Sequence, residues 1–90
     1  MTEFTRDPPI WLPSRQVIAF DVDHDGRKLP CAITKDALER MAGGGRRSSR
    51  ALYPAFGAAR TRILAAVTAK LALTLAAGSA EILLTIADLF

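Results

Sequence analysis

The stretch VIAFDVDHDGRKLPCAIT, residues 17–34, decides the fold of this chain because it has the pattern of a β-hairpin. Asp25-Gly26 is a favoured pair for a two-residue hairpin turn, in which both central residues have positive φ. This turn places Ile18 opposite Ile33. Six apolar side chains then share one face, namely Ile18, Phe20, Val22, Leu29, Cys31 and Ile33. A slip of one residue would destroy this separation, so the register is well specified.

The same stretch also matches half of a calcium-binding loop. Asp21, Asp23, Asp25 and Gly26 have the spacing of the first half of that motif. Its last position should be a glutamate that supplies two oxygens to the ion, and this chain has Ala32 there. We therefore favour the hairpin over the calcium site, and we expect neither a metal nor a cofactor.

Pro30 bears on the order of the strands. Proline has no N–H for a β-ladder, so the second hairpin strand should lie at a sheet edge. The C-terminal segment Ile82–Ile86 alternates as a strand does. We expect it to pair with the first hairpin strand, which gives the order 2-1-3. Leu83, on the other face of that strand, indicates cover on both sides, supplied by Ile10–Leu12 or by a second copy of the protein.

Two helices are expected between these strands. Thr34 is a suitable N-cap for the first, and Gly43–Gly45 end it. A second helix is expected over 53–78, because Pro54 suits a first turn and Gly78 an end. Its buried stripe, at helical spacing, consists of Phe56, Ile63, Val67, Leu71, Thr74 and Leu75.

Arg60 points near the middle of this stripe. Its stem covers apolar surface while the guanidinium reaches water or a carboxylate such as Asp88, or else it forms a specific anion site. The predicted architecture is α+β, a small antiparallel sheet of hairpin and C-terminal strand packed against two helices. Residues 1–90 should form one small domain, with a flexible N-terminus (1–9) and a flexible basic loop (43–52).

The sequence carries few signs of chemistry. The single cysteine, Cys31, should be a buried and inert core residue, and His24 should belong to a solvated turn. The N-terminus lacks the basic and apolar regions of a signal peptide. The apolar segment 63–77 is interrupted by Lys70 and is too short to span a membrane. We therefore expect a cytoplasmic protein without a membrane partner.

In its order of motifs the chain resembles a bacterial family known as domain of unknown function 1488. The shared features are a strand at Val17–Val22, the Asp25-Gly26 turn, the strand Leu29–Thr34, and a short helix with Ala37-Leu38-Glu39 and Gly43. Further along, Phe56, Arg60, Ile63 and Lys70 are similar to the family's helix, and Ile82–Leu89 to its final strand and Asp-Leu ending. The resemblance implies a fold and no particular activity.

Two functional hypotheses remain, and neither is an enzyme, because no catalytic constellation is present. The first is a non-enzymatic interaction module that binds itself or another protein, with Leu73 and Leu83 in the interface. The alternative is weak binding to nucleic acid or another polyanion. Residues 40–70 hold seven bases and no acid, and the candidate contacts are Arg46, Arg47, Arg50, Arg60 and Arg62.

Overall fold

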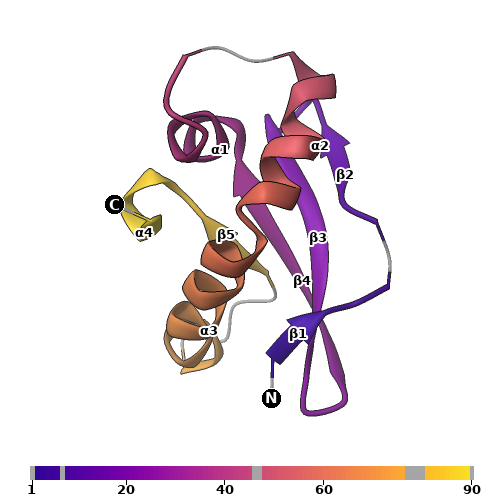
Figure 1. Ribbon diagram of the computed structural model, residues 1–90. Coiled ribbons are helices and arrows are strands. Elements are labelled where there is room, and N and C mark those ends of the chain that lie inside the picture. Colours follow the sequence, from indigo (N-terminus) through magenta and orange to yellow (C-terminus); the bar gives the residue numbers. More distant parts are fainter. Residues whose placement is uncertain (1, 7, 46–47, 77–80, 90) are drawn as a thin grey trace.

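A computed structural model describes residues 2–6, 8–45, 48–76 and 81–89 of the chain. In this part of the chain a five-stranded sheet packs against helices (Figure 1). The strands are β1 (Thr2–Phe4), β2 (Ile10–Leu12), β3 (Val17–His24), β4 (Arg27–Thr34) and β5 (Ile82–Leu84). The helices are α1 (Lys35–Met41), α2 (Ser49–Ala58), α3 (Arg60–Ala76) and α4 (Ile86–Leu89). The predicted α+β class is confirmed.

β3 and β4 form the predicted hairpin in the predicted register, with Ile18 opposite Ile33. The turn residues Asp25 and Gly26 have φ values of 51° and 83°, as this type of turn requires. The Asp23 carboxylate accepts a hydrogen bond from the Gly26 N–H at 3.1 Å. Five of the six apolar side chains on the common face are buried, so this face forms the sheet side of the core.

The predicted strand order 2-1-3 is wrong, because β5 pairs with β4 and not with β3. It runs parallel to β4, with Cys31 opposite Ile82 and Ile33 opposite Leu84. The prediction relied on the missing N–H of Pro30. β5 meets β4 only from Cys31 onward, so no donor is needed from Pro30. The proline thus limits the extent of the pairing and does not prevent it.

Two N-terminal strands occupy the other side of β3. β1 pairs with residues 22–24 and β2 with residues 17–19, both antiparallel. Ile10–Leu12, one of two alternatives for covering a face of the C-terminal strand, instead extends the sheet as β2. Trp11 packs against the core, whereas Ile10 is 57% exposed. β1 lies within the segment 1–9, for which flexibility stays a prediction.

α1 begins and ends where the sequence predicts. The Thr34 hydroxyl accepts a hydrogen bond from the Ala37 N–H at 3.2 Å, which satisfies a free donor of the first turn. Gly43, Gly44 and Gly45 follow the helix with φ values of 103°, 87° and 86°. Because L side chains rarely adopt these values, the three glycines allow the chain to leave the helix.

The single long helix expected over 53–78 is in fact two helices. α2 begins earlier than predicted because Ser48 caps it, with its hydroxyl accepting from the Ala51 N–H at 3.4 Å. Ala59, with φ −100° and ψ 7°, ends α2 just before α3 begins. Pro54 therefore lies inside α2 and not in its first turn. The start of α2 falls in the segment 43–52, whose flexibility stays a prediction.

The C-terminal strand is shorter than the predicted Ile82–Ile86, because the chain turns into α4 after Leu84. The Asp88 carboxylate accepts from the Thr85 N–H at 2.8 Å, and the Thr85 carbonyl accepts from the Asp88 N–H at 3.0 Å. Thr85 and Asp88 have the spacing of a capping box, which marks the start of a helix. This local signal outweighs the alternation of apolar residues.

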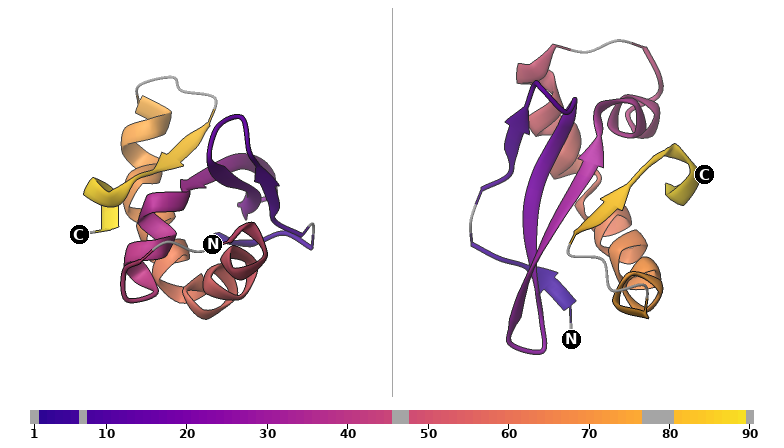
Figure 2. Two further views of the ribbon diagram at one scale, coloured as in Figure 1. Left: turned by 90° about the horizontal axis from the view of Figure 1, so that it is seen from above. Right: turned by 180° about the vertical axis from the view of Figure 1, so that it is seen from behind.

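Helices α2 and α3 cover one face of the sheet, and the opposite face is turned toward the viewer in the right panel of Figure 2. The predicted helix stripe is buried at Phe56, Ile63, Val67, Leu71 and Thr74, and the side chain of Leu75 lies outside the described part. On the sheet side Ile82 and Leu84 are buried in the same core. Leu83, between them, points to the opposite face because side chains alternate along a strand.

Side chains from the helices bind backbone groups at both edges of the sheet. The Tyr53 hydroxyl accepts from the Trp11 N–H of β2 at 3.0 Å. The Lys70 ammonium donates to the Leu83 carbonyl of β5 at 2.6 Å and to the Asp88 carboxylate at 2.9 Å. These backbone groups, which would otherwise face solvent or a further strand, are therefore already paired.

Candidate functional site

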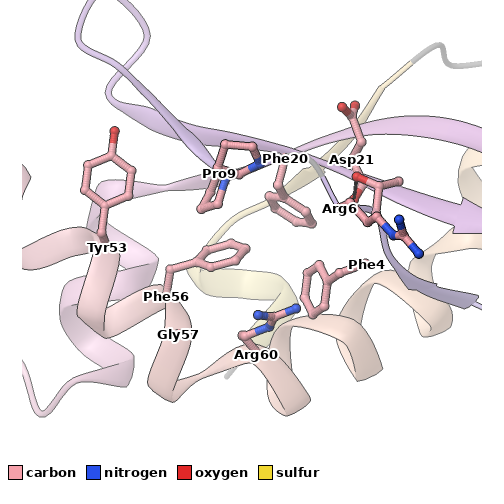
Figure 3. A pocket seen from close by; sticks show the side chains of 11 residues that line it. Phe4, Arg6, Pro9, Phe20, Asp21, Tyr53, Phe56, Gly57 and Arg60 are labelled. Carbon is pink, nitrogen blue, oxygen red and sulfur yellow. Dashed lines mark hydrogen bonds between the residues drawn. The ribbon is translucent and has the colours of Figure 1, made fainter.

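A pocket of about 290 Å³ lies between the connection from β1 to β2 and helix α2 (Figure 3). It is formed by segments that are far apart in the sequence, since its walls come from residues 4–6, 8 and 9, from β3 and from residues 53–60. The side chains that matter most for its chemistry are Phe4, Phe20, Tyr53, Phe56 and Arg60.

The pocket exists because the N-terminal chain leaves the edge of β3 and then returns to it. Thr5 still donates its N–H to the Asp21 carbonyl at 3.2 Å, and pairing with β3 resumes at Ile10. Pro8 and Pro9 lie in between and have no N–H for a β-ladder. The connection therefore bows outward and leaves space beside Phe20 and Asp21.

Three phenylalanines form one wall of this pocket. The rings of Phe4, Phe20 and Phe56 lie with their centroids 5.1–5.7 Å apart at steep interplanar angles, the arrangement that aromatic quadrupoles favour. They come from β1, β3 and α2, so the cluster joins the N-terminal strand to the hairpin and to the helix. Phe56 was predicted to belong to the core stripe, but the sequence did not indicate the role of Phe4.

Arg60 lies beside this cluster, with its guanidinium carbon 4.7 Å from the centroid of the Phe4 ring (Figure 3). The guanidinium lies over the Phe4 ring, and Asp88 is not its partner. Asp88 pairs with Lys70 at 2.9 Å. The cation of Arg60 is thus placed over an aromatic face at the pocket, and such contacts are attractive because the ring face carries partial negative charge.

Gly57 lies in the last turn of α2, which ends at Ala58. A glycine in a helix costs up to roughly 1 kcal/mol relative to alanine. A Cβ added at Gly57 would meet no atom within 4 Å, and the residue lines the pocket. The missing side chain therefore adds to the open space between Phe56 and Tyr53.

The five candidate polyanion contacts do not all fall in the described part of the chain. Arg46 and Arg47 lie outside it. Arg50 is exposed in the first turn of α2, whereas Arg60 and Arg62 are exposed at the start of α3. The ten residues of α2 separate these positions by roughly 15 Å. The structure therefore does not bring the described arginines together at one point.

The two candidate interface residues lie on different surfaces. Leu73 is 72% exposed on α3, which packs against the helix-covered face of the sheet. Leu83 is half-buried on the opposite face. Around Leu73 the outward side of α3 is apolar or hydroxylic, and its exposed residues include Thr61, Ala65, Thr68, Ala69 and Ala72. We call these five residues and Leu73 the α3 face.

The remaining titratable candidates have local roles. His24 is not simply solvated, since its Nδ1 lies 2.8 Å from the Thr2 hydroxyl and its Nε2 lies 3.5 Å from the Asp25 carboxylate. Cys31 is buried as predicted, and burial raises the pKa of its thiol to about 12. Such a thiol stays protonated and unreactive at neutral pH. Among the described residues no group of three metal-binding side chains is found, and no helix could cross a bilayer.

Comparison with known proteins identifies the family that shares this fold. Residues 3–84 match the model of a family described as protein of unknown function (DUF1488). The chain belongs to the DUF1488 family. A crystal structure of a DUF1488 protein of unknown function from Shewanella loihica PV-4 has a similar fold, with a TM-score of 0.72 and 19% identity over 90% of each chain. A search of curated proteins found no match.

The resemblance to the DUF1488 family noted from the sequence is thus confirmed, and its motif residues are neighbours in space. Phe56 and Arg60 both line the pocket, and Lys70 contacts Asp88 of the Asp-Leu ending. The sequence did not reveal that the N-terminus completes the pocket of this chain, because Phe4 reaches the pocket only through the pairing of β1 with β3. The signals that were present are Pro8-Pro9 and the helical Gly57.

Proposed function

We propose that this DUF1488 protein is a non-enzymatic interaction module that self-associates through the α3 face. The exposure of Leu73, at 72%, carries the proposal, because this leucine is surrounded by other exposed apolar residues. Scattered single leucines on a surface are ordinary, whereas a continuous apolar surface marks a site of protein interaction.

The charges of α3 favour a second copy of the same helix as the partner. Arg60 and Arg62 lie in the first turn, where the helix dipole disfavours cations, and no acidic residue lies there. In an antiparallel pair each first turn would lie beside the negative end of the other α3. Ala65 and Ala69 on the α3 face permit two helices to approach closely. A two-fold axis then relates identical surfaces.

The experiment is light scattering over a dilution series, together with two charged variants. Ala69→Lys places two ammonium groups against each other in the proposed dimer, so we expect only monomer. Ala58→Lys is the matched control, because Ala58 is an exposed alanine of α2 outside the α3 face. Both variants should keep the circular dichroism of the wild type. A wild type that is monomeric at every concentration, or equal association of the two variants, would rule the proposal out.

The other functional expectations stay predictions beside this one. Binding of a polyanion has less support, because Arg50 lies at the far end of α2 from Arg60. A different protein as partner, with Leu83 in the interface, is the other alternative. Binding to such a partner should be left unchanged by Ala69→Lys. We keep the cytoplasm as the expected location.

A further inference from the structure

We propose that the pocket between residues 4–9 and α2 binds a small aromatic carboxylate. This inference goes beyond self-association and does not depend on it. The pocket is lined by Phe4, Phe20, Tyr53, Phe56, Gly57 and Arg60 among others, and none of its lining residues belongs to the α3 face. The site and its ligand class follow from three observations, on size, wall and charge.

The size of the pocket suits a ligand with a single ring. Its volume of about 290 Å³ lies near the lower end of the range for small-molecule sites, roughly 300–1,000 Å³. Gly57 lines this space without a side chain, and a Cβ added there would meet no atom within 4 Å. A planar molecule of one ring with a short substituent therefore fits, and a nucleotide or a coenzyme does not.

The wall of the pocket favours an aromatic ring over an aliphatic group of equal size. Phe4, Phe20 and Phe56 already contact one another at steep angles, so their positions are fixed before any ligand arrives. A fourth ring can join such a cluster edge to face, which is a preferred geometry for aromatic pairs. Pro9 lines the same pocket and adds a further apolar surface.

The charge at the pocket favours a carboxylate on that ring. Arg60 is held over the Phe4 ring and its guanidinium has donors left for a ligand. A planar guanidinium binds a carboxylate with two parallel hydrogen bonds. Among the described lining residues the competing negative charge is Asp21, whose carboxylate is turned away from Arg60 and the rings in Figure 3 and lies 3.5 Å from the Lys28 ammonium. A ligand carboxylate bound to Arg60 would therefore not face the Asp21 carboxylate, which would repel it.

Binding can be measured by NMR on the ¹⁵N-labelled full chain, titrated with phenylacetate and, in parallel, with phenylacetamide. The two probes have the same shape, but only the first is charged. We expect saturable shifts of amide signals from residues 4–9 and 53–60 with phenylacetate. The amide should bind roughly tenfold more weakly, because it lacks the charge-assisted pair with Arg60.

Two variants separate the aromatic part of the site from its charge. Gly57→Leu fills the pocket and should abolish binding of both probes. Arg60→Gln should weaken phenylacetate to the level of phenylacetamide and leave the latter unchanged. Arg60 is exposed, so this second variant should fold even if the first does not.

Four outcomes would overturn the inference. They are the absence of saturable shifts in the wild type, shifts confined to other parts of the chain, equal affinity for the two probes, and full phenylacetate affinity in Arg60→Gln. The dilution series on Ala69→Lys is independent of all four, so failure of the ligand site is distinguishable from failure of self-association.

Discussion

Lys70 and Asp88 are 18 positions apart in the sequence, and their contact holds the C-terminal segment against α3. Partial burial opposes ionisation of Asp88, but hydrogen bonds from Lys70 and Thr85 outweigh it and hold the pKa of the carboxyl below its ordinary value of 3.8. The group has fewer partners in the unfolded chain, so its ionisation stabilises the fold above the ordinary carboxyl range. That contribution is lost as the pH falls through the lowered pKa.

Replacement of Asp88 by asparagine should therefore remove part of the acid sensitivity of the protein. We expect Asp88→Asn to lower the free energy of unfolding by roughly 1 kcal/mol at about pH 6, and by less at about pH 3. Urea denaturation at both pH values measures this. The exposed Asp36, replaced in the same way, is the control. An equal loss at both pH values would show that the Asp88 charge is not what stabilises the C-terminal segment.

At the scale of elements, two glycines differ in backbone conformation, one in a turn and one in a helix. Gly26 has a φ of 83° in the hairpin turn, whereas the φ of Gly57 in α2 lies outside the left-handed range. Nothing lies within 4 Å of a Cβ added at either position. Any difference between the two alanine variants must then come from the backbone.

We expect Gly26→Ala to lower the free energy of unfolding by about 1–2 kcal/mol, because an L side chain is strained at that φ. Gly57→Ala should raise it by roughly 0.5–1 kcal/mol, because alanine favours the helix. Thermal and urea denaturation of both variants test the pair. If both changes destabilise, a side chain at Gly57 clashes with neighbouring atoms, which contradicts the open space beside this residue.

The elements that the sequence predicted correctly are those governed by local signals. The Asp25-Gly26 turn fixed the hairpin register, and Thr34 fixed the start of α1. The errors arose where a second local signal was overlooked, as at Ser48, which begins α2, and at Thr85, which begins α4. At the first place Pro54 indicates a later helix start, and at the second the alternation of apolar residues indicates a longer strand.

At the scale of the whole molecule, sequence patterns could not predict contacts between distant segments. The pairing of β1 with β3 and of β5 with β4 depends on which edges remain free once the hairpin exists. The pocket depends on both the N-terminus and α2, so Phe56 and Arg60 could be singled out while Phe4 could not. Only the resemblance to the DUF1488 family covered most of the chain. It predicted the fold, but it did not predict the pocket.

The distribution of charge over the molecule allows a test of the polyanion alternative. Residues 40–90 carry seven bases and two acids. If the basic segment binds nucleic acid, fluorescence anisotropy should show binding to labelled DNA at low salt that weakens steeply as salt rises. The triple replacement Arg46/Arg47/Arg50→Ala should abolish that binding. Absence of binding at low salt would exclude this function and leave protein interaction.

The hydrogen bonds from Tyr53 to β2 and from Lys70 to β5 have a consequence for behaviour at high concentration. Unpaired strand edges are templates on which other chains add strands, and this is a common route to filaments and amyloid. Here a side chain from a helix already occupies a backbone group of β2 and one of β5, which are two of the edge strands. Addition of a further strand at these two positions is therefore disfavoured while both helices stay in place.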